Sequence, residues 1–126
     1  MDLTASVLVV DDQSALRDNV RQAPEEASHQ VLTAGDGMEG LTLYEQHRES
    51  IAAVLTDMGL PKISGYDMFQ KIRELNPRAR VILASGYLNP ALKSKLFVAG
   101  AKAFIAKPYQ TADVLIKLRE VLDLPE

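Results

Sequence analysis

Three aspartates follow directly after two short apolar segments of the chain. Residues 7–10 lead into Asp11 and Asp12, and residues 51–56 lead into Asp57. If these segments are neighbouring parallel strands, the three carboxylates meet at one edge of a sheet, where each like-charged pair costs roughly 4 kcal/mol at about 4 Å. An aspartate after a strand can also simply cap a helix. Two adjacent acids opposite a third instead favour a site for a divalent cation.

A hydroxyl and an ammonium group follow two further apolar segments. Ser85 comes after residues 80–84, and Lys107 closely follows residues 102–105. Carboxylate oxygens are suitable ligands for Mg²⁺, whose coordination shell is usually completed by oxygens of a substrate phosphate. A lysine and a hydroxyl would stabilise the oxygens of a transferring phosphoryl group. One carboxylate can then act as a nucleophile and form an aspartyl phosphate. Asp57 is the best candidate because it stands alone at its strand end, whereas the adjacent pair suits metal binding.

Apolar runs of strand length alternate with longer segments of helical period, which predicts βαβ units on a parallel sheet. The predicted strands are residues 7–10, 30–34, 52–56, 80–84 and 102–105. Capping-box pairs at Asp36/Glu39 and Ser64/Asp67 mark the starts of two helices. Five such units predict a compact three-layer α/β sandwich, in which ligands bind at the carboxyl ends of the strands.

The first predicted helix, from about Ser14 to Ser28, contains Pro24. A proline inside a helix removes a hydrogen bond and costs about 3 kcal/mol unless the helix kinks or restarts. We therefore expect a bend or break close to Arg21.

Bulk composition excludes several other classes of protein. The 126 residues fit one domain, and 47% hydrophobic with 25% charged residues is ordinary for a globular protein. There is no cysteine for a disulfide or thiolate metal site, and no apolar run approaches the ~18 residues of a membrane span. A net charge of -3 gives no electrostatic case for nucleic acid. A cytoplasmic location is the default expectation.

Four ordered motifs carry a resemblance to a known family: VLVVDD, LTDMGLPKISGYD, VILASGY and AFIAKPY. Over roughly Val7 to Leu122 the chain resembles the response regulator receiver domain of two-component signalling. This resemblance implies a flavodoxin-like (βα)5 fold with strand order 2-1-3-4-5. It also implies that the chain accepts a phosphoryl group from a histidine kinase or phosphotransfer protein, in a reaction that needs Mg²⁺ or Mn²⁺.

The resemblance assigns the metal and acceptor roles to four residues. Asp57 matches the phosphoacceptor, and Asp12 and Asp57 match the carboxylate ligands of the metal. Asp11 matches the residue that orients a coordinated water, and Gly59 the one whose backbone carbonyl binds the metal.

Three further residues match the family's phosphoryl-binding and switch positions. Ser85 matches the hydroxyl that grasps the phosphoryl group, and Lys107 the lysine that bridges to one of its oxygens. Phe104 occupies the switch position on the fifth strand, where many relatives carry a tyrosine whose hydroxyl it lacks. The family's partner surface is the face formed by the fourth helix, the fifth strand and the fifth helix, and we expect neither direct nucleic-acid nor membrane binding.

Two other functions compete with a phosphorylated receiver. A phosphohydrolase with an aspartyl nucleophile generally needs an acid two residues later, where this chain has Gly59. A receiver that works without phosphorylation would not need to retain all of the acidic, hydroxyl and lysine groups. We therefore expect a single receiver domain over residues 1–126, with its core at about 6–123, no output domain and no turnover of an external substrate. It is either a stand-alone regulator or a module from a hybrid histidine kinase.

Overall fold

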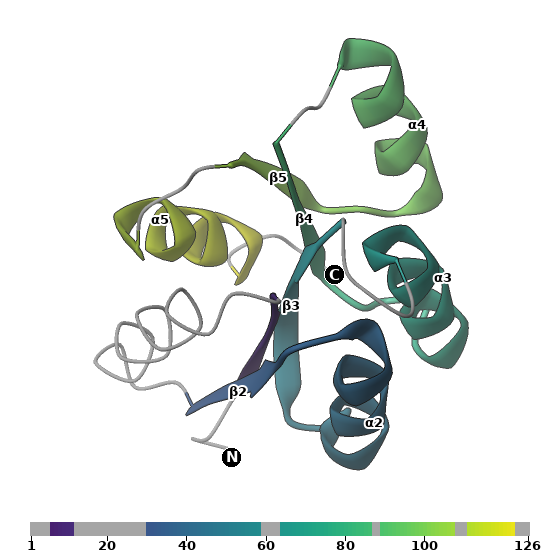
Figure 1. Ribbon diagram of the computed structural model, residues 1–126, viewed down its shortest axis with the longest axis vertical. Helices are drawn as coiled ribbons and strands as arrows, with labels where there is room; N and C mark the ends of the chain where they lie inside the picture. Colours follow the sequence, from purple (N-terminus) through teal and green to yellow (C-terminus); the bar gives the residue numbers. More distant parts are fainter. Residues whose placement is uncertain (1–5, 12–29, 59–63, 87–88, 108–110, 123–126) are drawn as a thin grey trace.

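The computed structural model of the chain describes residues 6–11, 30–58, 64–86, 89–107 and 111–122 (Figure 1). The first predicted helix, with Pro24 and its expected bend, lies outside these residues, as do Asp12 and Gly59.

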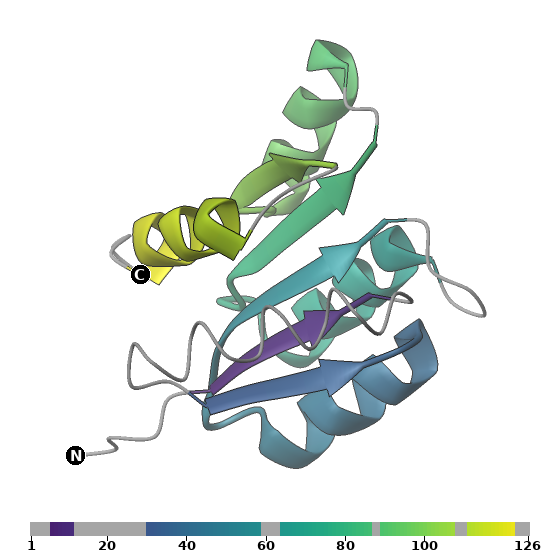
Figure 2. The same ribbon diagram turned by 60° about the vertical axis from the view of Figure 1, so that its left-hand side comes forward.

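Five parallel strands form one sheet in the order β2-β1-β3-β4-β5, which confirms the predicted topology. The strands are β1 (Ser6–Val10), β2 (Gln30–Ala34), β3 (Ile51–Asp57), β4 (Val81–Ser85) and β5 (Ala103–Ala106). Each observed strand lies within one residue of its predicted bounds at either end. Because all five strands run in the same direction, their carboxyl ends lie at one edge of the sheet (Figure 2).

Helices cover both faces of the sheet and give the predicted three-layer α/β architecture. The described helices are α2 (Gly37–His47), α3 (Gly65–Leu75), α4 (Pro90–Ala99) and α5 (Thr111–Leu122). The side chains of Asp36 and Ser64 accept hydrogen bonds from the backbone N–H groups of Glu39 and Asp67, so both predicted helix starts are confirmed. None of the helices that the structure describes is long and apolar enough to cross a membrane.

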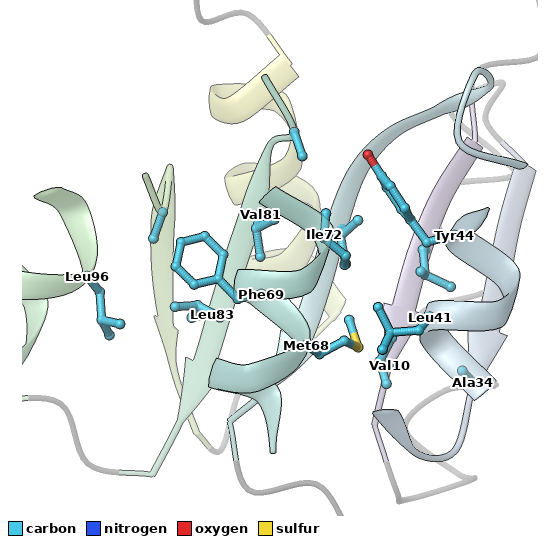
Figure 3. Packing of buried hydrophobic residues seen from close by; sticks show 14 of the residues in the cluster. Val10, Ala34, Leu41, Tyr44, Met68, Phe69, Ile72, Val81, Leu83 and Leu96 are labelled. Carbon is cyan, nitrogen blue, oxygen red and sulfur yellow. The ribbon is translucent and has the colours of Figure 1, made fainter. Parts of the chain in front are cut away.

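Alternate residues of each strand face two separate hydrophobic clusters, as expected for a sheet covered on both faces. Leu8 and Val10 of β1 pack towards α2 and α3, whereas Val7 and Val9 pack towards α5. Figure 3 shows the first cluster, in which Leu96 of α4 lies at the opposite end from the α2 residues. Because helices pack on both faces of the sheet, the strands are held in place, and so are the polar residues at their carboxyl ends.

Candidate functional site

Two buried carboxylates lie side by side at the carboxyl edge of the sheet. Val10 of β1 pairs with Thr56 of β3, so Asp11 and Asp57 both come immediately after this pair. Asp11 is 1% exposed and Asp57 is 8% exposed. The backbone N–H of Asp11 donates to the carbonyl of Ala34, 3.0 Å away, which extends the β1–β2 pairing to the site.

The ammonium group of Lys107 contacts both carboxylates. Its Nζ lies 2.7 Å from Oδ2 of Asp57 and 3.6 Å from Oδ2 of Asp11. Lys107 directly follows β5, and its backbone N–H donates to the carbonyl of Ser85 at 2.9 Å. Since β4 lies between β3 and β5, the lysine reaches across the end of β4, where the partly exposed Ser85 lies.

The surroundings of Lys107 raise the pKa of its ammonium group above the ordinary value of 10.5. Partial burial acts to lower this pKa, because it disfavours the charged form. The hydrogen bond to Asp57 and the negative charges of Asp11 and Asp57 together outweigh that effect. Lys107 is therefore a permanent cation at neutral pH.

Helix α3 begins against the backbone of Asp57, because Gly65 has no side chain. A Cβ atom at Gly65 would lie 2.1 Å from the carbonyl oxygen of Asp57 and 2.6 Å from Cα of Met58. The backbone N–H of Gly65 donates to the carbonyl of Met58 at 3.1 Å, and the N–H of Met58 donates to Ala84 at 2.9 Å. These two bonds fix the chain on both sides of the segment that contains Gly59. Sequence reasoning did not identify this role for Gly65, although a glycine directly after the helix cap Ser64 was a usable signal.

The structure brings together Asp11, Asp57 and Lys107, with Ser85 beside them on the next strand end. Their assigned roles remain predictions. Within the described part of the chain, no three acidic, histidine or cysteine side chains are grouped to hold a metal. The predicted ligand set includes Asp12 and Gly59, which lie outside the described residues.

The donor groups at this edge nevertheless fit a small, hard cation. Asp11 and Asp57 offer carboxylate oxygens, the ligands that Mg²⁺ prefers. Both are buried, and both face the same positive group. The site therefore already accommodates one cation, the lysine ammonium, between two strand ends.

Comparison with known proteins identifies the class to which this fold and site belong. Residues 7–119 match the response regulator receiver domain family, so the chain is a receiver domain of two-component signalling. It is 31% identical over 116 residues to the chemotaxis protein CheY of Thermotoga maritima, covering 91% of this chain and 95% of CheY. It is also 31% identical over 119 residues to the probable transcriptional regulatory protein TcrX of Mycobacterium tuberculosis, covering 93% of this chain but only 49% of TcrX.

A solved structure agrees with this assignment. The CheX-CheY complex with BeF₃ and Mg²⁺ from Borrelia burgdorferi contains a chain that superposes with a TM-score of 0.87 at 32% identity. The match covers 94% of this chain and 90% of that chain. The predicted family and the predicted fold are thus both confirmed.

Proposed function

We propose that Asp57 accepts a phosphoryl group from the phosphohistidine of a kinase or phosphotransfer protein, in a reaction dependent on Mg²⁺ or Mn²⁺. The observation that carries the proposal is the contact of Lys107 Nζ with Asp57 Oδ2 at 2.7 Å, beside the buried Asp11. A carboxylate fixed beside a permanent cation is positioned to attack phosphorus as a nucleophile. The same cation can then neutralise negative charge on the oxygens of the phosphoryl group that the carboxylate has accepted.

The transfer forms one bond and breaks one bond at phosphorus. A carboxylate oxygen of Asp57 donates an electron pair to the phosphorus, and the bond from phosphorus to the histidine nitrogen breaks with its electron pair. The imidazole already carries a proton on its other ring nitrogen, so it leaves as the neutral group. Lys107 and the hydroxyl of Ser85 donate hydrogen bonds to the phosphoryl oxygens.

Asp12, Asp57 and the backbone carbonyl of Gly59 would hold the divalent cation, and Asp11 would orient a water molecule coordinated to it. When bound, the cation neutralises charge on the phosphoryl oxygens. The CheY chain from Borrelia burgdorferi, which was solved with BeF₃ and Mg²⁺, supports this assignment.

Phosphorylation changes a protein-interaction surface rather than turning over an external substrate. The downstream partner binds the face formed by α4, β5 and α5, on which Phe97 and Ile116 are exposed beside Phe104. The CheX bound to CheY in the Borrelia burgdorferi complex supports a protein as the partner. We place this activity in the cytoplasm, either in a stand-alone regulator or within a longer signalling protein.

Intact mass spectrometry after incubation with acetyl phosphate and Mg²⁺ tests the proposal. We expect the wild-type chain to gain the mass of one phosphoryl group, and Asp57→Asn to gain none while keeping its fold. Asp67→Asn, which changes an exposed acid near the start of α3, is the matched control and should be phosphorylated like the wild type. Equal incorporation into wild type and Asp57→Asn, or incorporation that persists in excess EDTA, would show the proposal wrong.

A further inference from the structure

Helix α4 is attached to the sheet by few side chains. Across its full length, Pro90–Ala99, which the structure describes throughout, Leu96 is the one buried residue, and Leu92 is partly buried. The helix lies beside β5, at the opposite end of the sheet from α2 (Figure 1). A helix with so little buried apolar surface is easily displaced, so each remaining contact has a large influence on its position.

Phe97 provides a further contact between α4 and the sheet. Its ring meets the ring of Phe104 edge to face, with centroids 4.8 Å apart and planes at 87°. Phe97 is 52% exposed, whereas Phe104 is 8% exposed, so the outer ring covers the inner one. Edge-to-face pairs at this separation are favourable beyond the area that they bury.

Phe104 belongs to the strand that leads into the functional site. It pairs with Leu83 of β4, and two residues further along Ala106 pairs with Ser85. The next residue is Lys107, whose N–H is bonded to the Ser85 carbonyl and whose Nζ contacts Asp57. The packing of Phe104 therefore helps to fix the end of β5 from which the lysine extends.

We propose that Phe97 is a positioning residue that links the placement of α4 to the phosphorylation site, through its ring contact with Phe104 and the β5 strand that carries Lys107. The inference rests on the proposed function and adds to it a residue that no sequence motif marks. Phe104 has no hydroxyl to hold it by a hydrogen bond, and the Phe97 ring supplies the restraint from outside. Without that ring, Phe104 and the end of β5 sample more conformations. Lys107 and Ser85 are then both placed to bind a phosphoryl group at Asp57 in a smaller fraction of molecules.

Binding of beryllium fluoride to the full chain in excess Mg²⁺, followed by calorimetry, tests this link. Apparent affinity falls in proportion to the fraction of molecules in the competent arrangement. We expect Phe97→Ala to weaken binding about two- to tenfold, the range that corresponds to the loss of one aromatic pair. Phe97→Tyr keeps the ring and should bind within about twofold of the wild type. Val98→Ala is the matched control, since it truncates a neighbour that is 90% exposed and should also leave affinity unchanged.

The outcomes separate this inference from the proposed function. A wild-type chain that does not bind beryllium fluoride would overturn both. Wild-type binding with unchanged affinity in Phe97→Ala, or with an equal loss in Val98→Ala, would overturn the role of Phe97 alone. Urea unfolding without ligand gives a second readout. A merely structural role would lower the free energy of unfolding of Phe97→Ala and leave its affinity unchanged, which also contradicts the proposal.

Discussion

At the scale of single residues, the site depends on one ammonium group shared by two buried carboxylates. Lys107 lies 2.7 Å from Asp57 and 3.6 Å from Asp11, and its side chain is 21% exposed. Removing the lysine would leave the two buried carboxylates without this partner, and a buried polar group left unsatisfied costs roughly 1–3 kcal/mol. The lysine that we propose binds the phosphoryl group therefore also stabilises the fold while Asp57 is unmodified.

We expect the stabilising contribution of Lys107 to disappear at alkaline pH. The pKa of Lys107 is raised on folding, so the folded chain binds this proton more tightly than the unfolded chain does. The contribution is fully present below the unfolded value of 10.5 and is lost as the pH rises through the higher pKa of the folded state. Urea unfolding of wild type and Lys107→Met, with a chelator present to exclude metal, compares their free energies of unfolding. We expect the two to differ by about 1–3 kcal/mol at neutral pH. The difference should shrink as the pH rises above 10.5.

Lys117→Met is the matched control for this measurement. Lys117 lies 3.5 Å from Glu120 in an exposed pair on α5, and such pairs contribute little. Its unfolding free energy should stay close to that of the wild type at every pH. A difference between wild type and Lys107→Met that stays constant through the alkaline range would contradict the assigned interaction.

At the scale of secondary-structure elements, helix α3 begins in close contact with the end of strand β3. We expect Gly65→Ala to destabilise the chain by roughly 1–3 kcal/mol, as overpacking does elsewhere, because its Cβ would lie 2.1 Å from the Asp57 carbonyl oxygen. The higher helix propensity of alanine would offset only about 0.5–1 kcal/mol. Gly86→Ala is the control, since a Cβ there meets nothing within 4 Å. Equal unfolding free energies for the two variants in urea would show that α3 can move away from Asp57 at no cost.

The strands and helix starts were predictable because their signals are local. The apolar run before Asp57 and the cap at Ser64 each depend on a few neighbouring residues, and both are confirmed. The strand order came from the family resemblance, since alternation alone does not specify it. The contact of Gly65 with the Asp57 backbone and the pairing of Phe97 with Phe104 join separate elements. Neither leaves a periodic pattern in the sequence. The glycine directly after Ser64 is a local sign of a close approach, but it does not specify the Asp57 backbone as the group approached, and no local signal marks the ring pair.

At the scale of the whole molecule, the sheet order determines which charges meet. β1 and β3 are neighbours, so the two acids meet directly, whereas β5 lies two strands from β3 and a long side chain is needed to reach it. A shorter residue than Lys107 would leave the two buried carboxylates without this cation. The topology thus collects negative charge at one edge, and that charge opposes folding unless a cation compensates it.

A ligand that binds only the folded arrangement should therefore stabilise the whole domain. We expect Mg²⁺ to raise the free energy of unfolding by about 1.4 kcal/mol at a concentration ten times its dissociation constant. Asp57→Asn should lose most of this increase because it removes one of the carboxylates, whereas Glu74→Gln, which neutralises an exposed acid on α3, should keep it. Urea unfolding over a range of Mg²⁺ concentrations, at constant ionic strength set by a monovalent salt, measures the effect. If Glu74→Gln lost as much of the increase as Asp57→Asn, Mg²⁺ would be acting through general screening of the net charge of -3 and not through the strand-end carboxylates.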